Sequence, residues 1–270
     1  MKATLSKKIL AISFFIALAF EATPQAWADT FFGERPTGLI KLDEYRYPVY
    51  LYVPEITDSA QLLPLIISLP GDGENPKKHI ESWASFAKQK NLIVFTPEIK
   101  LRYTDVPYQT DIWLIRIKND VVRRYQVASN KIFLVGTGNN AHYAGYLGAK
   151  YPKEFSAAAL LGGSWVGPLE GLIPVESRPV KQLPFFVSLM KESGPTVSAT
   201  QRKADELMEK GYPVNFEVID EQQTFSKADF RQRMIGWLNA KSQTRELIVQ
   251  KSEKSWKERL HKGIENFFEV

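Results

Sequence analysis

The chain has 270 residues, of which 44% are hydrophobic and 24% charged, with a formal net charge of +5 and no cysteine. These values are typical of a globular protein with one domain or at most two. They exclude a disulfide framework and a thiolate site, and the interspersed acids and bases contain no block of like charge that would favour nucleic acid.

Residues 1–28 are predicted to be a secretory signal peptide. Three lysines within the first eight residues precede an apolar run at 9–20, and Ala26-Trp27-Ala28 supplies a small-x-small cleavage pattern. We expect cleavage after Ala28 and a secreted or periplasmic protein. The apolar run is shorter than the about 20 residues of a transmembrane helix, so an uncleaved N-terminal anchor is the alternative. No transmembrane segment is expected in the mature chain.

Residues 29–240 alternate short apolar runs with amphipathic helical patterns, which indicates an α/β domain. Two strands or an edge hairpin are predicted at 39–53, and further strands at 64–69, 91–96, 131–135, 157–161, 184–190 and 213–219. Helices are predicted at 79–90, 111–125, 139–151, 200–210 and 225–238. This alternation favours a mostly parallel sheet flanked by crossover helices.

Residues 241–270 are predicted to form a C-terminal amphipathic helical extension. The stretch is rich in charge, and Trp256, Leu260, Ile264 and Phe267 recur at helical spacing. We expect this stripe to be buried against the body of the protein, because an amphipathic helix gains stability mainly by covering its apolar face. A helix that binds a partner or a membrane surface is the alternative.

The order of these segments resembles that of secreted α/β-hydrolases of the polyhydroxybutyrate-depolymerase and feruloyl-esterase-like group, from about residue 45 to 239. "PLIISLPGDGEN" resembles the strand and oxyanion loop of that family, and "FAKQKNLIVFTPE" resembles its next helix and strand. "NKIFLVGTGNNAHYAGYLGAKYPKEFSAAALLGGS" resembles the nucleophile strand, elbow, helix and following strand. The resemblance implies an α/β-hydrolase-type sheet and a Ser-His-acid triad.

The positions that the resemblance assigns to the triad carry other residues. The elbow pattern G-x-S-x-G corresponds to residues 136–140, so that Gly138 stands at the nucleophile position and Asn140 replaces the second flanking glycine. We expect Asn140 to crowd the crossing of strand and helix. The acid position corresponds to Gly194, with Glu192 two residues away. The histidine is expected within residues 220–225, which contain none, and Pro70 stands where the oxyanion loop commonly has histidine.

Three residues are weighed as substitutes for the missing nucleophile and base. Thr137 precedes the apex of the elbow, Ser164 ends a neighbouring strand, and His142 lies one helical turn after Gly138. Each has a structural interpretation that we favour: a structural threonine, a serine with a pocket-lining or structural role, and a histidine that packs against the sheet or caps a loop. Asp72 and Glu74 lie in the former oxyanion loop and are interpreted as solvated loop residues, with binding of a cation or a polar ligand as the alternative.

The sequence therefore predicts an exported protein of the α/β-hydrolase type without catalytic residues, which binds a small ligand or a protein partner. The residues expected to line its cleft are Pro70, Gly71, Asp72, Gly138, Asn139, Ser164 and Trp165. No cofactor is expected, and no metal, since His79, His142 and His261 are widely spaced. The alternatives are an active esterase or depolymerase with a rearranged catalytic set and a module that binds a partner through its C-terminal helix.

Overall fold

The predicted strands form one eight-stranded sheet in a computed structural model that describes residues 36–55, 61–99, 109–174, 182–220 and 224–268. For residue 253 and residues 258–268 only the backbone is described. The described elements belong to one compact unit, Thr37–Glu55 and Leu62–Val270. The predicted signal peptide and its cleavage position lie outside the described residues.

The sheet is mostly parallel, and helices flank it, as predicted. Its strands lie in the order β1-β2-β4-β3-β5-β6-β7-β8. The pairs β1·β2 and β2·β4 are antiparallel, and the other pairs are parallel. The strands are β1 (Gly38–Leu42), β2 (Val49–Val53), β3 (Leu63–Leu69), β4 (Ile93–Pro97), β5 (Val127–Thr137), β6 (Ala157–Leu161), β7 (Phe185–Met190) and β8 (Val214–Ile219). The expected edge hairpin is thus β1 and β2.

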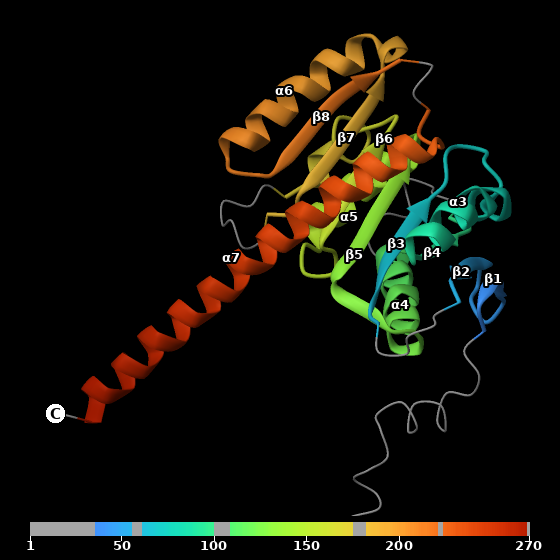
Figure 1. The fold of residues 1–270 in the computed structure, drawn as a ribbon. Helices are drawn as coiled ribbons and strands as arrows, with labels where there is room; N and C mark the ends of the chain where they lie inside the picture. The colour runs from blue at the N-terminus through green and yellow to red at the C-terminus, as the bar shows by residue number, and fades with distance from the viewer. Residues whose placement is uncertain (1–35, 56–60, 100–108, 175–181, 221–223, 269–270) are drawn as a thin grey trace, which may run out of the picture. The chain divides into compact units, whose positions relative to one another are not determined.

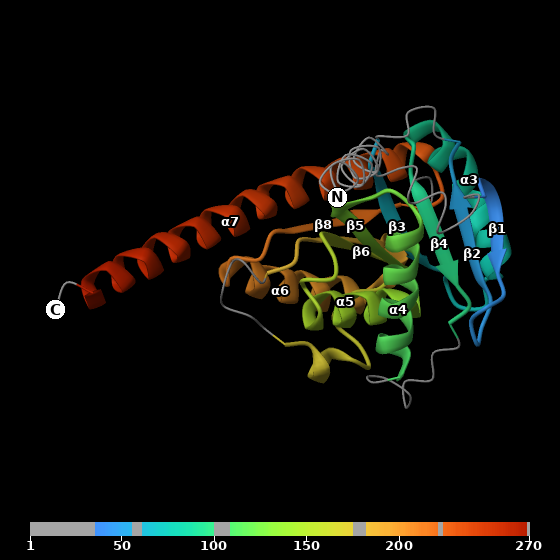
Figure 2. The ribbon, with the colours of Figure 1, turned by 90° about the horizontal axis from the view of Figure 1, so that it is seen from below.

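Helices cover both faces of the sheet. Figure 2 shows α3 and α7 on one face and α4, α5 and α6 on the other. The helices are α3 (Pro76–Lys90), α4 (Gln109–Arg124), α5 (Asn139–Lys150), α6 (Pro195–Glu209) and α7 (Ala228–Phe268), with short 3₁₀ helices η2 (Glu170–Leu172) and η4 (Lys191–Ser193). No helix among the described residues combines the length and the apolar composition needed to cross a membrane.

Helices α3 and α6 begin three and five residues earlier than predicted, for local reasons. Helix α3 starts at Pro76 because the Asn75 side chain accepts hydrogen bonds from the amides of Lys77 (3.0 Å) and Lys78 (3.1 Å), which satisfies amides that a helix leaves free. Helix α6 starts at Pro195, which suits a first helical turn because proline lacks the amide that would go unused there.

The largest difference from the prediction concerns the C-terminal part of the chain. The helix expected at 225–238 and the extension expected from 241 form one continuous helix, α7. The expected burial of Trp256 is wrong, since its side chain is 57% exposed. Figure 1 shows that α7 has run past the sheet before it ends, so the sheet does not cover this part of the helix. The side chains of Leu260, Ile264 and Phe267 lie outside the described residues.

The core beneath α3 and α7 is apolar and contains one buried cation. Ile80 and Trp83 of α3 and Met234 and Leu238 of α7 pack against the sheet. Arg231 of α7 places its guanidinium 4.0 Å from the Trp83 ring centroid and donates to the carbonyl oxygen of residue 82 (2.5 Å). Burial lowers the pKa of Arg231 to about 10, so the side chain remains charged at neutral pH and links α7 to α3.

On the opposite face, a buried carboxylate joins α4 to α5. Asp111 is fully buried and accepts hydrogen bonds from the hydroxyls of Tyr143 (2.9 Å), Tyr146 (2.8 Å) and Tyr151 (3.2 Å). Burial raises the pKa of Tyr143 well above its usual range, and the Asp111 carboxylate raises it further. These phenols therefore stay protonated as donors, which satisfies the buried carboxylate.

Candidate functional site

The turn between β5 and α5 has the backbone of a nucleophile elbow. Gly138 adopts φ 59° and ψ −130°, a conformation that residues with a side chain rarely adopt. Its amide donates to the carbonyl oxygen of Leu161 on β6 (2.8 Å). The residue at the nucleophile position is therefore presented at the carboxyl end of the sheet, as a hydrolase presents its serine, but it carries no side chain.

The strand and helix cross closely at Gly136. A Cβ at this residue would lie 2.3 Å from the carbonyl oxygen of Asn140, 2.8 Å from Cα of Ala141 and 2.7 Å from Cβ of Ala144. The expectation that Asn140 crowds this crossing is wrong. Its side-chain amide points away and donates to the carbonyl oxygen of Pro70 (2.7 Å), so Asn140 ties α5 to the loop after β3.

Two carboxylates of that loop accept hydrogen bonds from the amides that would form an oxyanion hole. In hydrolases of this type, the hole consists of the amide after the nucleophile and an amide of the loop between the third strand and the next helix. Here the Asn139 amide donates to Asp72 Oδ2 (3.3 Å), and the Gly71 amide donates to Glu74 Oε2 (2.9 Å). A Cβ at Gly138 would lie 3.3 Å from the same Asp72 oxygen. Fixed negative charge therefore stands where an oxyanion would develop.

His79 holds Glu74 in this position. Its Nδ1 lies 2.8 Å from Glu74 Oε2, and its Nε2 lies 2.7 Å from the hydroxyl oxygen of Ser68 and 3.3 Å from the indole nitrogen of Trp83. Because an indole N–H can only donate, Nε2 accepts, which puts the imidazole proton on Nδ1, facing Glu74. Ser68, His79 and Glu74 thus have the contact lengths of a Ser-His-acid triad, yet Ser68 is fully buried within β3.

The contact with His79 should make the stability of the loop depend on pH. The close contact with His79 Nδ1, together with the hydrogen bond from the Gly71 amide, holds the pKa of the Glu74 carboxyl below its usual value. A lowered folded-state pKa means that this stabilisation is present above the unfolded pKa of about 4.3 and is lost as the pH falls through the folded pKa. Glu74→Gln should lower the melting temperature at pH 7 by about 2–4 °C, for a half-exposed contact worth about 1 kcal/mol.

The difference in melting temperature between Glu74→Gln and the parent should shrink as the pH falls below about 4, because the unfolded carboxyl becomes protonated first and the folded carboxyl, with its lower pKa, follows. Glu192→Gln, which removes an exposed carboxylate in the 3₁₀ helix η4, is the control and should change stability by less than about 0.5 kcal/mol. A difference in melting temperature between Glu74→Gln and the parent that does not change with pH would contradict a stabilising role for the ionised Glu74 carboxylate.

The predicted positions of the acid and the base bring no catalytic group to the elbow. Gly194 is exposed between η4 and α6, and among the described residues no hydrogen bond or ion pair joins Glu192 or Gly194 to a histidine. The segment expected to carry the histidine lies partly outside the described residues. Its last residue, Phe225, places its ring edge 3.3 Å from where a Cβ of Gly162 would lie, so an aromatic ring packs beside the elbow.

The three weighed substitutes have packing contacts. The Thr137 γ-methyl faces Gly71, 3.6 Å from where its Cβ would lie. Ser164 is fully buried and its hydroxyl oxygen lies 2.7 Å from that of Thr200. His142 Nδ1 donates to the carbonyl oxygen of Ser164 (2.6 Å), and its ring lies against Gly167. These contacts agree with the structural interpretations.

A polar cavity of about 380 Å³ opens beside the elbow. Its lining includes Pro70, Gly71, Asp72 and Asn139, together with Glu74 and Glu98. The expectation that Ser164 and Trp165 line this cavity is wrong, because Ser164 has no exposed surface and Trp165 is 1% exposed and packs edge-on against Phe185 (5.2 Å between ring centroids) in the core. Gly138, which was expected there too, lies beside Asp72 and is not part of the lining. The lining that the structure describes is acidic, which would repel a developing oxyanion.

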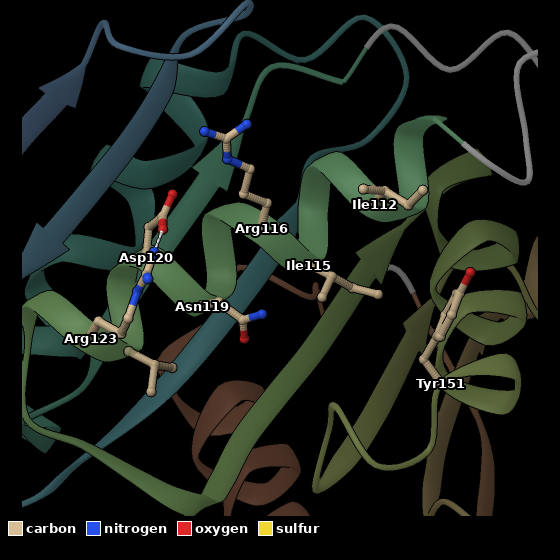
Figure 3. A pocket seen from close by; sticks show the side chains of 8 residues that line it. Ile112, Ile115, Arg116, Asn119, Asp120, Arg123 and Tyr151 are labelled. Carbon is tan, nitrogen blue, oxygen red and sulfur yellow. Dashed lines mark hydrogen bonds and ion pairs between the residues drawn. The ribbon is translucent and has the colours of Figure 1, made fainter.

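A second hollow, of about 560 Å³, lies along the outer side of α4 and is distinct from the elbow. Figure 3 shows Ile112 and Ile115 of α4 and the Tyr151 ring on its lining, with the Asp120–Arg123 ion pair on the same helix. Tyr151 follows the last residue of α5, whereas the elbow precedes the first. The hollow is therefore at the opposite end of α5 from Gly138.

Comparison with known proteins identifies the fold. No family model matches the sequence, and no curated protein sequence matches it. Solved structures do match: MGS-M1, an α/β-hydrolase enzyme from a Medee basin deep-sea metagenome library, has a TM-score of 0.59 at 15% identity over 78% of this chain and 100% of its own. FphF, a fluorophosphonate-binding serine hydrolase of Staphylococcus aureus, has a TM-score of 0.57 at 13% identity over 76% and 99%.

A thermostable esterase matches with a TM-score of 0.56 at 18% identity over 74% of this chain, which spans 61% of the length of that esterase. These identities are low, so the likeness concerns the arrangement of strands and helices. The strand order, the crossover helices and the elbow between β5 and α5 agree with it. The chain has the α/β-hydrolase fold.

Proposed function

We propose that this protein is a non-catalytic α/β-hydrolase-fold protein that binds a ligand or a partner. One observation carries the proposal: Gly138 occupies the nucleophile position, and the carboxylates of Asp72 and Glu74 accept the hydrogen bonds of the two amides that an oxyanion would need. Acyl transfer requires a nucleophile, a base within hydrogen-bond reach and stabilisation of negative charge. Among the residues that the structure describes, none meets these requirements at the elbow, which supports the proposal.

The cavity beside the elbow supports a binding role. Its volume of about 380 Å³ falls within the range of about 300–1,000 Å³ that is usual for small-molecule sites. The hydrogen bonds of Asp72, Glu74 and Asn140 hold its walls in place.

The purified protein should not react with a fluorophosphonate probe and should not hydrolyse an activated acyl ester above background. Removing the triad residues of a serine hydrolase can cost about 10⁶-fold in turnover. Mass spectrometry after probe treatment should therefore find no labelled serine or threonine, with a triad-bearing esterase as the positive control. Stoichiometric labelling of Thr137 or Ser164 would overturn the proposal.

The second candidate is an esterase with a rearranged catalytic set, and the contact of His79 with Ser68 and Glu74 favours it. Ser68 has no exposed surface, so an acyl carbon could reach its hydroxyl only after β3 and the loop that follows had moved. Labelling of Ser68 in the same experiment would select this candidate.

Export is part of the proposal, because the basic, apolar and small-residue segments of residues 1–28 follow the order of a signal peptide. Protein recovered from outside the cytoplasm should begin at Asp29 when its N-terminus is sequenced. Recovery of a chain that begins at Met1 would contradict cleavage and support the uncleaved anchor.

A further inference from the structure

A groove runs along the outer side of α4 and past the end of α5. The hollow of about 560 Å³ along α4 and a neighbouring hollow of about 360 Å³ share Tyr151 in their linings, so the two are continuous. Together they are here named the α4 groove. Figure 3 shows its larger part, with Ile112 and Ile115 on the side of α4 and the Tyr151 ring on the other side. The α4 groove shares none of its described lining with the cavity beside the elbow.

The lining of the α4 groove is largely apolar although it faces solvent. Ile112 is 66% exposed, and Ile115 and Val122 are partly exposed on the same helix. Residues 115 and 122 are seven apart, so their side chains leave α4 in nearly the same direction. Tyr151 and Pro152 continue the apolar surface into the smaller hollow. Single exposed hydrophobic residues are ordinary on a protein surface, whereas contiguous ones around a hollow indicate an interaction site.

Bases outnumber acids around the α4 groove. Its lining contains the acids Asp120 and Glu154 and the bases Arg116, Arg123, Lys150 and Lys153. Both acids already have a cationic partner: Asp120 forms an ion pair with Arg123, and Glu154 forms one with Lys118 (2.5 Å). The carboxylates of the lining are therefore engaged within the protein itself.

Two cations of the lining remain without a carboxylate. Lys150 forms an ion pair with the buried Asp111 (3.4 Å), but no ion pair among the described residues involves Arg116 or Lys153. Arg116 borders the larger hollow and Lys153 the smaller one. Unmatched positive charge therefore lies beside the apolar lining in both parts of the groove, which complements an apolar partner that carries carboxylates.

The shape of the α4 groove distinguishes between kinds of occupant. A small ligand is normally buried over most of its surface in an enclosed site, whereas the α4 groove is open to solvent. A membrane takes up an apolar face that enters the lipid, whereas these apolar residues surround a hollow. An amphipathic helix fits better, because it inserts apolar side chains one turn apart into a groove and carries its charges beside them.

We propose that the α4 groove binds an amphipathic helix of a partner protein, with apolar side chains of that helix in the groove and its carboxylates beside Arg116 and Lys153. The apolar contacts supply most of the binding energy, and the two unmatched cations select an acidic helix over a basic one. This site lies apart from the elbow, so the inference goes beyond the proposed function, and neither an esterase assay nor a fluorophosphonate probe decides it.

Two model peptides test the proposal on the purified protein. Both form helices with leucine at positions i, i+3, i+4 and i+7, and the residues beside the leucines are glutamate in one peptide and lysine in the other. Fluorescence anisotropy should show that the glutamate peptide binds about 10-fold more tightly. Added salt should narrow this difference, because it screens exposed charges. No binding of the glutamate peptide, or equal binding of the two peptides, would overturn the proposal.

Matched substitutions test whether the peptide occupies the α4 groove. Ile112→Glu and Leu247→Glu each place a carboxylate at an apolar helix position that is 66% exposed, but only Ile112 lines the groove. Ile112→Glu should weaken binding of the glutamate peptide by about 10-fold or more, because it removes an apolar contact and adds repulsion. Leu247→Glu should leave binding within about 2-fold of the parent. Equal effects of the two substitutions would contradict the site.

A second matched pair tests the charge. Arg116→Glu and Arg202→Glu each reverse an exposed arginine, and Arg202 lies on α6, away from the groove. Arg116→Glu should weaken the glutamate peptide by about 3- to 10-fold and strengthen the lysine peptide, whereas Arg202→Glu should change neither by more than about 2-fold. Unchanged peptide preference in Arg116→Glu would overturn the proposal. Binding to vesicles that contain phosphatidylglycerol, if Ile112→Glu abolished it, would assign the groove to a membrane instead.

Discussion

Gly136→Ala should destabilise the protein by about 3 kcal/mol or more, or prevent it from folding. The new Cβ would lie 2.3 Å from the carbonyl oxygen of Asn140 and 2.8 Å from Cα of Ala141. Both are backbone atoms of α5, so no side-chain rotation can relieve the contact. The helix would have to move away from β5, and overpacking that shifts backbone costs about 1–3 kcal/mol and sometimes more. Thermal or urea unfolding measures the loss.

Gly236→Ala is the matched control for this prediction. Nothing lies within 4 Å of the position that its Cβ would take, and the residue is in the middle of α7. Removing a glycine from a helix interior should stabilise the protein by about 0.5–1 kcal/mol. Gly136→Ala with the melting temperature of the parent would show that α5 does not cross β5 as closely as described.

Gly138→Ser should give no measurable ester hydrolysis, although it restores a hydroxyl at the nucleophile position. The described residues place no imidazole beside that hydroxyl, and the Asp72 carboxylate lies 3.3 Å from where the new Cβ would be. The amides of Asn139 and Gly71 are already engaged. Without a base, turnover should remain at least about 10⁴-fold below that of a hydrolase with a complete triad.

Gly138→Ala is the control that distinguishes the effect of backbone strain from the effect of the new hydroxyl. Alanine and serine would both be forced into φ 59° and ψ −130°, which costs about 1–3 kcal/mol, or about 2–4 °C in melting temperature for each kcal/mol. The two variants should therefore lose the same stability and share the same background rate in an ester assay. Hydrolysis by Gly138→Ser that Gly138→Ala lacks would show that a base reaches the elbow and would contradict the proposed function.

The order and type of most elements could be predicted because hydrophobic periodicity and turn residues are local signals. The strand at residues 157–161 was predicted at its observed bounds, and α5 ends one residue before its predicted end. Helix α7 could not be predicted as one helix, because the change from covering a sheet to extending beyond it leaves no signal in the helical pattern. The exposure of Trp256 depends on where the body ends.

The candidate site was predicted in part. Gly138 at the nucleophile position follows from residues 136–140 alone. The contacts of Ser68, His79 and Glu74 were missed, since none of these residues belongs to a recognisable motif. Their only signal in the sequence is that they lie close together, on a strand, in the loop that follows it and in the first turns of the next helix. The prediction that Asn140 crowds the crossing of β5 and α5 was wrong, because the direction of the Asn140 side chain depends on its hydrogen bond to the loop after β3.

The sequence by itself determined that this protein is a mostly parallel α/β domain whose elbow lacks a serine, because neighbouring residues encode those features. Only the tertiary structure decided that carboxylates accept the hydrogen bonds of the amides at the elbow. Asp72 and Asn139 are 67 residues apart along the chain, and they meet because β3 pairs with β5 in parallel, which brings the loops at their carboxyl ends together. A hydrogen bond between such distant residues depends on the pairing of whole strands, and no local pattern records it.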